Sequence, residues 1–158
     1  MANKIKKILF VSKDPGGVNS LIPIIKECER KKSKIEFHVI SHKLSAYRYK
    51  EENIKTIMLD KFNYNSSKKK AVSNIIEFYQ PHLIITGTSR PYDFDPITPE
   101  QIFIEISKKK KIKSICILDY WGDYLERFSS PNGKFNSSYV ADKICALDQE
   151  SKMSLLDI

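Results

Sequence analysis

The stretch KILFVSKDPGGVNSLIP, residues 7–23, decides the fold. It begins with a short, continuous apolar run (7–12), which is typical of a strand buried on both faces of a parallel sheet. The run leads through Asp-Pro-Gly-Gly into an amphipathic segment, which we expect to form a helix over residues 19–32 with Asn19 or Ser20 as its N-terminal cap. A strand that passes through a glycine-rich loop into a helix is the first half of a βαβ unit.

The rest of the chain repeats this alternation of short apolar runs and helical patterns. We expect further strands at residues 35–41, 55–60, 82–88, 114–119 and 143–148, and further helices at residues 43–52, 68–80 and 99–110. The last of these helices has a clear start, because Thr98 can cap it and Pro99 suits its first turn. The rhythm predicts a single Rossmann-like α/β domain over residues 1–158, with three α/β/α layers and a six-stranded parallel sheet in the order 3-2-1-4-5-6.

The overall composition excludes several classes of protein. The chain has 158 residues, of which 41% are hydrophobic, and this is enough for one globular core. Its apolar runs are much shorter than the ~18 residues of a membrane helix. The basic start, MANKIKKILFV, continues into SKDPGG and not into a small-residue cleavage site, so we expect no signal peptide and a cytoplasmic location.

The net charge of +8 raises the question of nucleic-acid binding. Nearly all of the basic residues are lysines in runs beside the expected helices, such as residues 68–70 and 108–111. Specific readers of bases and phosphates rely more on arginine, of which the chain has few. We therefore expect a solvated, lysine-rich surface and no specific nucleic-acid partner. Weak attraction to acidic lipid headgroups at the inner membrane surface is an alternative.

The cysteines and histidines indicate neither a disulfide scaffold nor a metal site. Cys28, Cys116 and Cys145 are odd in number, lack C-x-x-C spacing and lie in apolar surroundings, so we expect all of them to be small buried side chains. We expect no metal and no cofactor. His42 follows the second expected strand directly, and it is the one histidine to which we assign a possible catalytic role.

Ligands of open α/β sheets bind beyond the carboxyl ends of the strands, and the first loop lies at such an end. Asp14, Gly16, Gly17 and Asn19 are therefore candidate ligand-binding residues. Glycines permit close approach of the backbone, and free amides at a helix start suit a phosphate or a sugar oxygen. The loop is neither G-x-G-x-x-G nor a Walker loop, so a dinucleotide or P-loop site is not expected. The alternative for the two glycines is a tight structural turn.

Two later loops add polar and aromatic side chains at the same edge. The long connection TGTSRPYDFDPITP supplies Thr88, Ser89 and Arg90, which we predict to bind a phosphate or sugar. The alternative for its hydroxyl groups is a structural loop whose polar side chains bond to their own backbone. The stretch ILDYWGDYLERF follows the fifth strand. It supplies Asp119 as a candidate general base, and Trp121 and Tyr124 as candidate contacts for a sugar or a lipid-linked group; for each, the alternative is a structural role.

These segments together resemble the N-terminal half of GT-B-type glycosyltransferases, a group that includes the UDP-N-acetylglucosamine 2-epimerases. The resemblance rests on KILFVSKDPGGVNSLIPII, LIITGTS, SICILDYWGDYLERF and DKICALDQESKMSLLDI, with Gly16-Gly17 after the first strand and the late strand motif at 142–148. The first loop departs from the GTRPE-like signature of the epimerases. By this resemblance, the first loop, His42 and the region of Trp121 would face an interdomain cleft.

The resemblance implies a function that needs a second domain. In the group, a C-terminal domain supplies most of the nucleotide-sugar site, and this chain stops where the connection to that domain would begin. We therefore expect the acceptor-side domain of a GT-B-like sugar transferase, inactive alone, with a sugar or lipid-linked acceptor. The missing half would be a partner chain or an absent C-terminal nucleotide-sugar domain, and a homodimer is a further possibility. The alternative is a stand-alone α/β ligand-binding or regulatory module without catalytic turnover.

Overall fold

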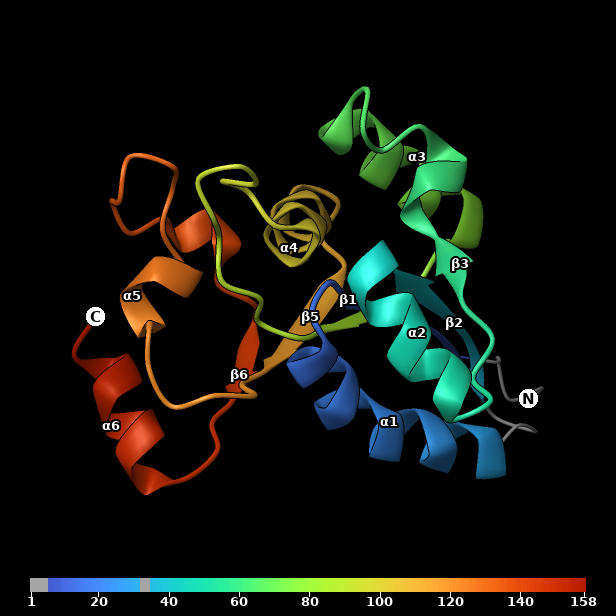
Figure 1. Ribbon diagram of the computed structural model, residues 1–158, viewed down its shortest axis with the longest axis horizontal. Helices are drawn as coiled ribbons and strands as arrows, with labels where there is room; N and C mark the ends of the chain where they lie inside the picture. The colour runs from blue at the N-terminus through green and yellow to red at the C-terminus, as the bar shows by residue number, and fades with distance from the viewer. Residues whose placement is uncertain (1–5, 32–34) are drawn as a thin grey trace.

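The computed structural model describes residues 6–31 and 35–158, and within them the strands form one parallel sheet in the order β3-β2-β1-β4-β5-β6 (Figure 1). The strands are β1 (Lys6–Ser12), β2 (Ile35–Ser41), β3 (Ile57–Met58), β4 (Leu83–Thr86), β5 (Lys113–Ile117) and β6 (Lys143–Cys145). The helices are α1 (Pro15–Arg30), α2 (Lys43–Glu51), α3 (Lys68–Tyr79), α4 (Pro99–Lys109), α5 (Tyr124–Arg127) and α6 (Gln149–Leu156), with 3₁₀ turns η1 (Leu59–Phe62) and η2 (Ser137–Tyr139). The predicted Rossmann-like architecture and strand order are confirmed.

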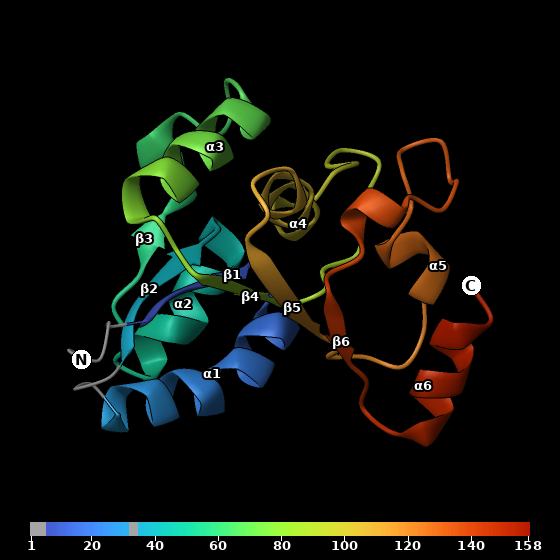
Figure 2. The ribbon, with the colours of Figure 1, turned by 180° about the vertical axis from the view of Figure 1, so that it is seen from behind.

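Helices cover both faces of the sheet, as the continuous apolar strands require. Figures 1 and 2 show α1 and α2 on one side of the sheet and α3 and α4 on the other. Alternate residues of β1 point to opposite faces. Leu9 and Val11 are buried in the cluster that includes residues of α3 and α4, while Phe10 is buried in the cluster that includes residues of α1 and α2. The central position of β1 therefore places its carboxyl end, and the loop that follows, in the middle of the sheet edge.

The first helix begins earlier than predicted. α1 starts at Pro15, with Asp14 in an extended conformation as its N-cap, so the prediction that Asn19 or Ser20 caps this helix is wrong. Proline is favoured at the first helical position because its fixed φ suits the helix and its missing N–H has no partner there anyway. Asn19 lies inside the helix. The predicted end at residue 32 lies outside the described residues, and the helix itself ends at Arg30.

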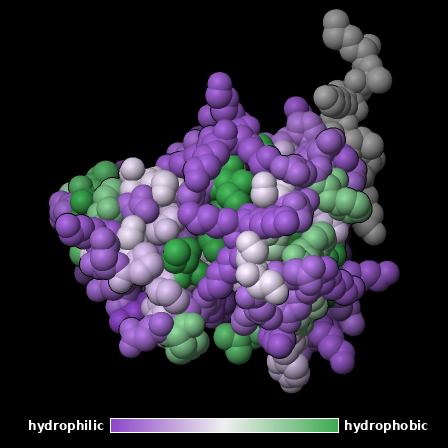
Figure 3. Space-filling model, turned by 90° about the horizontal axis from the view of Figure 1, so that it is seen from above, coloured by the Kyte–Doolittle hydropathy of each residue, from purple (hydrophilic) through white to green (hydrophobic). Residues whose placement is uncertain are grey.

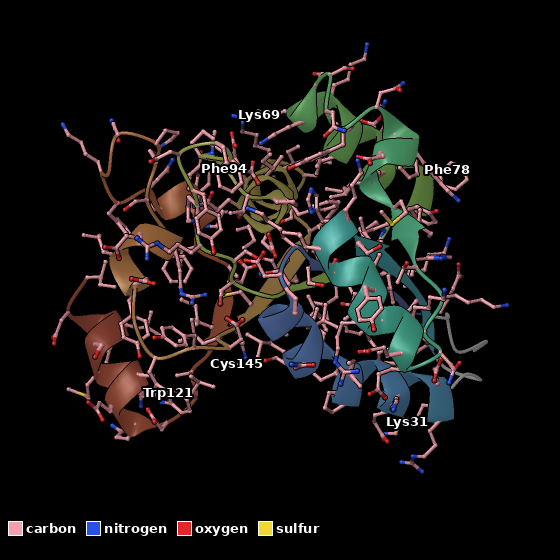
Figure 4. All side chains as sticks on the ribbon, viewed as in Figure 1. Lys31, Lys69, Phe78, Phe94, Trp121 and Cys145 are labelled. Atoms are coloured by element: carbon pink, nitrogen blue, oxygen red, sulfur yellow. The ribbon has the colours of Figure 1, made fainter. Side chains whose placement is uncertain are left out.

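The strands at the edges of the sheet are shorter than the sequence pattern predicts. β3 has two residues and β6 has three, and each pairs with a neighbour on one side only. Cys145 lies in β6 and is exposed, so the prediction of three buried cysteines is wrong at this position, while Cys28 and Cys116 are buried. Figure 4 labels Cys145 near the end of this strand. An apolar sequence context does not reveal whether a strand has a covered outer face.

The face of the molecule seen in Figure 3 is largely hydrophilic, with apolar residues in separate patches. Several lysines beside α3 and α4 pair with carboxylates: Lys69 and Lys109 with Glu105, and Lys110 with Glu77. Within residues 6–31 and 35–158, no helix combines the length and the apolar character that crossing a membrane requires.

Candidate functional site at the carboxyl edge of the sheet

The start of α1 packs directly against the ends of β4 and β5. A Cβ atom added to Gly16 would lie 2.2 Å from Asp119 Oδ2, which follows β5. A Cβ atom added to Gly87, directly after β4, would lie 3.0 Å from the Cα atom of Gly17. Only glycines permit the helix start to come this close to its neighbours. The two glycines of the first loop therefore have a packing reason, and they also place the first turn of α1 beside Asp119.

Substitution Gly87→Ala tests how tightly α1 is held against the sheet. The new methyl group meets backbone and not a flexible side chain, so the helix or the strand has to shift. We expect the free energy of unfolding in urea to fall by about 1–3 kcal/mol. Lys70→Ala, at an exposed position of α3, is the control and should change it by less than ~0.5 kcal/mol. A change at Gly87 no larger than that of the control would show that α1 is free to move away.

Asp119 is fixed by a buried arginine and a threonine. Arg127 Nη1 donates to Asp119 Oδ1 (3.1 Å), to Thr88 Oγ1 (3.2 Å) and to the Thr88 carbonyl oxygen. The Thr88 hydroxyl lies within donating distance of Asp119 Oδ1 (3.3 Å) and of the Ile117 carbonyl oxygen (3.2 Å). The side chains of Arg127 and Asp119 are only 6% and 11% exposed, so this ion pair is largely shielded from water.

The second oxygen of Asp119 remains available. Among the described residues, no group donates a hydrogen bond to Asp119 Oδ2, and this oxygen faces Gly16 at the start of α1. The amides of Gly16 and Gly17 lie in the first turn of the helix, where backbone N–H groups have no partner within the helix. The edge therefore places a carboxylate acceptor beside two helix-start amides, of which Gly16 is half-buried and Gly17 is buried.

Ser89 and Asp14 lie deeper than expected for surface ligand contacts. Ser89 is 5% exposed, and its hydroxyl donates to Glu100 Oε1 at 2.6 Å. The pKa of Asp14 is raised, mainly by burial and also by the negative charge of Asp119. The charge of Lys13 and a hydrogen bond with Ser89 act in the opposite direction. Asp14 is thus close enough to Asp119 for their negative charges to interact.

His42 lies at the carboxyl end of β2 and caps α2. Its Nδ1 accepts from the Leu44 amide at 3.5 Å, and the Ser45 hydroxyl accepts from the His42 amide at 3.0 Å. Burial lowers the pKa of His42, as does the charge of Lys13, while nearby carboxylates including Asp14 raise it. The capping box accounts for this histidine structurally, and its catalytic role stays a prediction.

Trp121 and Tyr124 line an exposed hollow against α6. Trp121 is 61% exposed, and its indole Nε1 donates to Asp148 Oδ2 at 2.7 Å, which places it beside α6 as Figure 4 shows. The hollow has a volume of about 320 Å³ and is also lined by Gly122, Glu150 and Ser154. Trp121 therefore does not belong to the core, and much of its side chain is exposed.

Arg90 and Asn19 are engaged with other surface groups. Arg90 is exposed, pairs with Asp123 at 3.2 Å and lines a hollow of about 390 Å³. This hollow lies between the β4–α4 connection and the segment after α5, which run side by side in Figures 1 and 2. Asn19 is exposed on α1, and its Oδ1 accepts from Arg48 Nε of α2 at 2.8 Å. This bond uses Oδ1 of Asn19 as an acceptor and does not use its Nδ2 amide group.

Three residues that sequence reasoning did not select are central to this edge. Lys13 is 1% exposed and pairs with Asp95 at 2.7 Å; Glu100 is 2% exposed; and Arg127 holds Asp119. Their partners are distant in sequence: 87 residues separate Lys13 from Glu100, and 39 separate Thr88 from Arg127. The sequence does show a charged residue after an apolar strand (Lys13) and at the start of a helix (Glu100). Charged residues at such positions are more commonly exposed, so they did not indicate burial.

The described part of the chain holds no group of three or more histidine, cysteine, aspartate or glutamate side chains that could bind a metal ion. Two carboxylates, Asp14 and Asp119, lie near the start of α1 and its backbone amides. Their chemistry is that of hydrogen bonding and proton transfer.

Comparison with solved structures identifies the fold. The chain matches a proposed UDP-N-acetylglucosamine 2-epimerase from Listeria monocytogenes over 99% of its length, with 12% identity and a TM-score of 0.69. It matches another UDP-N-acetylglucosamine 2-epimerase over 98% of its length, with 15% identity and a TM-score of 0.64. A UDP-GlcNAc 2-epimerase from Neisseria meningitidis, solved with UDP-GlcNAc bound, matches over 70% of the chain, with 16% identity and a TM-score of 0.54.

These likenesses confirm the GT-B-like fold. Because the sequence identities are low, they do not establish the activity of this chain. The chain spans 43% and 45% of the first two proteins and 32% of the Neisseria protein. No protein-family model matches the sequence, and no curated protein matches it.

Proposed function

We propose that this chain forms one wall of a sugar-binding cleft in a GT-B-like enzyme that transfers or epimerises a sugar, with Asp119 as the proton acceptor. The proposal rests on the hydrogen bonding of the two carboxylate oxygens of Asp119. Arg127 and Thr88 hold one of its oxygens, while the other faces Gly16 without a hydrogen-bond donor among the described residues. A carboxylate fixed in this way can orient a hydroxyl group and accept its proton.

The charges at this edge favour a sugar hydroxyl over a phosphate. The start of α1 would attract an anion by its free amides and its dipole. However, Asp119 Oδ2 already lies at Gly16, and Asp14 adds a second carboxylate whose pKa Asp119 influences. A hydroxyl group can accept from an amide of Gly16 or Gly17 and donate to Asp119, whereas a phosphate would be repelled by both carboxylates. We therefore assign the sugar part of the ligand to this wall.

The remaining candidate residues divide into supports and direct contacts. Thr88 and Ser89 are buried and hydrogen-bonded to protein groups, so we assign them the role of shaping the site. Trp121 and Tyr124 present exposed ring surface, which suits the apolar face of a sugar or a lipid-linked acceptor. Arg90 lines its own hollow and remains a candidate for contact with an acceptor.

We assign the nucleotide-diphosphate part to a second domain, on this polypeptide or on a partner. Sugar transfer requires both reactants in near-attack geometry, which a single open wall does not impose. The similar structures are more than twice as long as this chain, and this supports a two-walled arrangement. It follows that the chain alone should transfer no sugar. The alternative that we retain is a stand-alone ligand-binding or regulatory module.

Titration of the purified chain with UDP-GlcNAc and with free GlcNAc tests this function. We expect both to shift the NMR signals of the Gly16 and Gly17 amides, with an affinity weaker than micromolar by calorimetry and no product by mass spectrometry. Asp119→Asn should reduce these shift changes severalfold, because it removes a charge-assisted acceptor. Asp123→Asn is the matched control, since that carboxylate pairs with Arg90 at the surface.

The outcomes separate the two functions. Sugar-dependent shifts that disappear in Asp119→Asn support the cleft wall. Micromolar binding of a nucleotide sugar, or turnover by the chain alone, would contradict the two-walled arrangement. Tight binding of another ligand without turnover would favour the stand-alone module.

A further inference from the structure

Glu100 connects the two loops that form the candidate site. It is the second residue of α4 and is 2% exposed. Its Oε1 accepts from the backbone amide of Lys13 at 2.7 Å and from the hydroxyl of Ser89 at 2.6 Å. Lys13 directly follows β1 and Ser89 belongs to the connection after β4, so one carboxyl oxygen joins the ends of two adjacent strands.

The start of α4 has a capping box of its own. Thr98 Oγ1 accepts from the Gln101 amide at 3.3 Å, and Gln101 Oε1 accepts from the Thr98 amide at 2.9 Å. The Glu100 amide lies outside this box and bonds to the Glu100 carboxyl group. An acidic side chain that only served the helix start would stay at the surface. Glu100 instead points into the protein and also bonds to groups outside its own helix.

The surroundings of the other oxygen of Glu100 favour the protonated form of the side chain. Oε2 is buried and has no hydrogen-bond partner among the described residues. Burial raises the pKa of Glu100 to about 7; the hydrogen bonds from Ser89 and the Lys13 amide act in the opposite direction, and Asp14 raises the value further. A buried oxygen without a donor suits a protonated carboxyl group better than a carboxylate.

In the part of the chain that the structure describes, no cation pairs with Glu100. The ammonium group of Lys13 pairs with Asp95, which also pairs with Lys68 of α3. The other titratable groups near Glu100 are Asp14 after β1, Tyr49 of α2 and Tyr64 between η1 and α3. Burial raises the pKa of both tyrosines, and the charge of Glu100 raises both pKa values further. Glu100 therefore acts through hydrogen bonds and not through an ion pair.

We propose that Glu100 is a positioning residue: by accepting from the Lys13 amide and from Ser89 with one oxygen, it sets the start of α1 against the β4–α4 connection and thereby the geometry around Asp14 and Gly16. We call these two hydrogen bonds to Glu100 Oε1 the bridge; it is present in the protein without a ligand. Its effect on ligand binding rests on the function proposed above.

Amide hydrogen exchange at Lys13 tests the bridge without any ligand. Glu100→Gln keeps an acceptor oxygen, whereas Glu100→Leu removes it. We expect Lys13 exchange to be about tenfold faster in Glu100→Leu, relative to the Phe10 amide of the same strand, and to be near the wild-type rate in Glu100→Gln. Glu105→Gln is the control on the same helix, because Lys69 and Lys109 hold that carboxylate. Equal acceleration at Lys13 and Phe10 would indicate loss of stability only and would overturn the proposal.

The pH dependence of the Lys13 amide signal provides a second readout. We expect its NMR shift to change near pH 7 in the wild type and in Glu105→Gln, but not in Glu100→Gln. His42 also lies near Lys13, and burial and the charge of Lys13 lower its pKa from 6.5. A change near pH 7 that persists in Glu100→Gln would be assigned to another group and would count against the bridge.

Binding separates this inference from the proposed function. With UDP-GlcNAc as the probe, Glu100→Leu should reduce the shift changes at Gly16 severalfold, and Glu100→Gln should restore them. If the wild type shows no sugar-dependent shifts, the proposed function fails, while the exchange rates at Lys13 still decide the bridge. If Glu100→Leu binds as the wild type does, the bridge does not position the ligand site.

Discussion

Replacing Arg127 with alanine should lower the free energy of unfolding by about 3–5 kcal/mol. The substitution leaves the Asp119 carboxylate, which is 11% exposed, without its cation. It also removes the donors to the Thr88 and Gly122 carbonyl oxygens. Equilibrium unfolding in urea, followed by circular dichroism, measures the change. The size of the effect comes mainly from the unpaired charge left behind and not from the attraction between the two groups.

Two further variants identify the cause of this loss. Arg90→Ala removes an arginine that is exposed and pairs with Asp123, and it should cost no more than ~1 kcal/mol. Adding Asp119→Leu to Arg127→Met should recover much of the stability, because a buried ion pair can often be replaced by apolar groups. If Arg127→Ala costs less than ~1 kcal/mol, the ion pair is solvated and Asp119 is not held as described.

The protein should become less stable as the pH rises from about 4.5 to about 7, through Glu100. Burial raises its pKa to about 7 in the folded state, against an ordinary value of 4.5 that applies to the unfolded chain. In this interval the folded state binds the proton and the unfolded state releases it, so each step to higher pH favours unfolding. The full shift corresponds to roughly 3 kcal/mol.

The difference between the wild type and Glu100→Gln isolates this contribution. Glutamine does not titrate, so the stability of the variant relative to the wild type should increase as the pH rises over this interval. Glu105→Gln should show no such trend over this interval: burial acts to raise the pKa of Glu105, but Lys109 and Lys69 lower it overall, below its ordinary value of 4.5. The stability that Glu105 contributes is therefore lost as the pH falls. A constant difference between the wild type and Glu100→Gln from pH 5 to 8 would show that Glu100 has an ordinary pKa.

Local patterns predicted the elements that local energetics control. The Thr98-Pro99 start of α4 was correct to the residue, because capping depends on neighbours within one turn. The start of α1 was misplaced, although Asp14-Pro15 carries the same signal of a cap followed by proline. The glycines after it had suggested a longer loop. Here the information was present in the sequence and was read incorrectly.

The candidate site was predicted in outline and not in its internal contacts. The strand order places the ends of β1, β4 and β5 side by side, so the grouping of Gly16 and Gly17 with Asp119 follows from the topology. The topology does not reveal that Ser89 would donate to Glu100, or that Asn19 would turn to Arg48. Those contacts depend on the side-chain packing between elements.

By itself, the sequence determined the parallel sheet and its order, because apolar periodicity and right-handed crossovers act along the chain. Only the tertiary structure decided that Lys13, Glu100 and Arg127 are buried and that Cys145 is exposed. A charged side chain is buried only when a partner is at hand. The ion-pair partner of Arg127, Asp119, is 8 residues away, but Thr88 is 39 residues from Arg127 and the Lys13 amide is 87 residues from Glu100. Over the two longer separations, sequence patterns carry no information about contact.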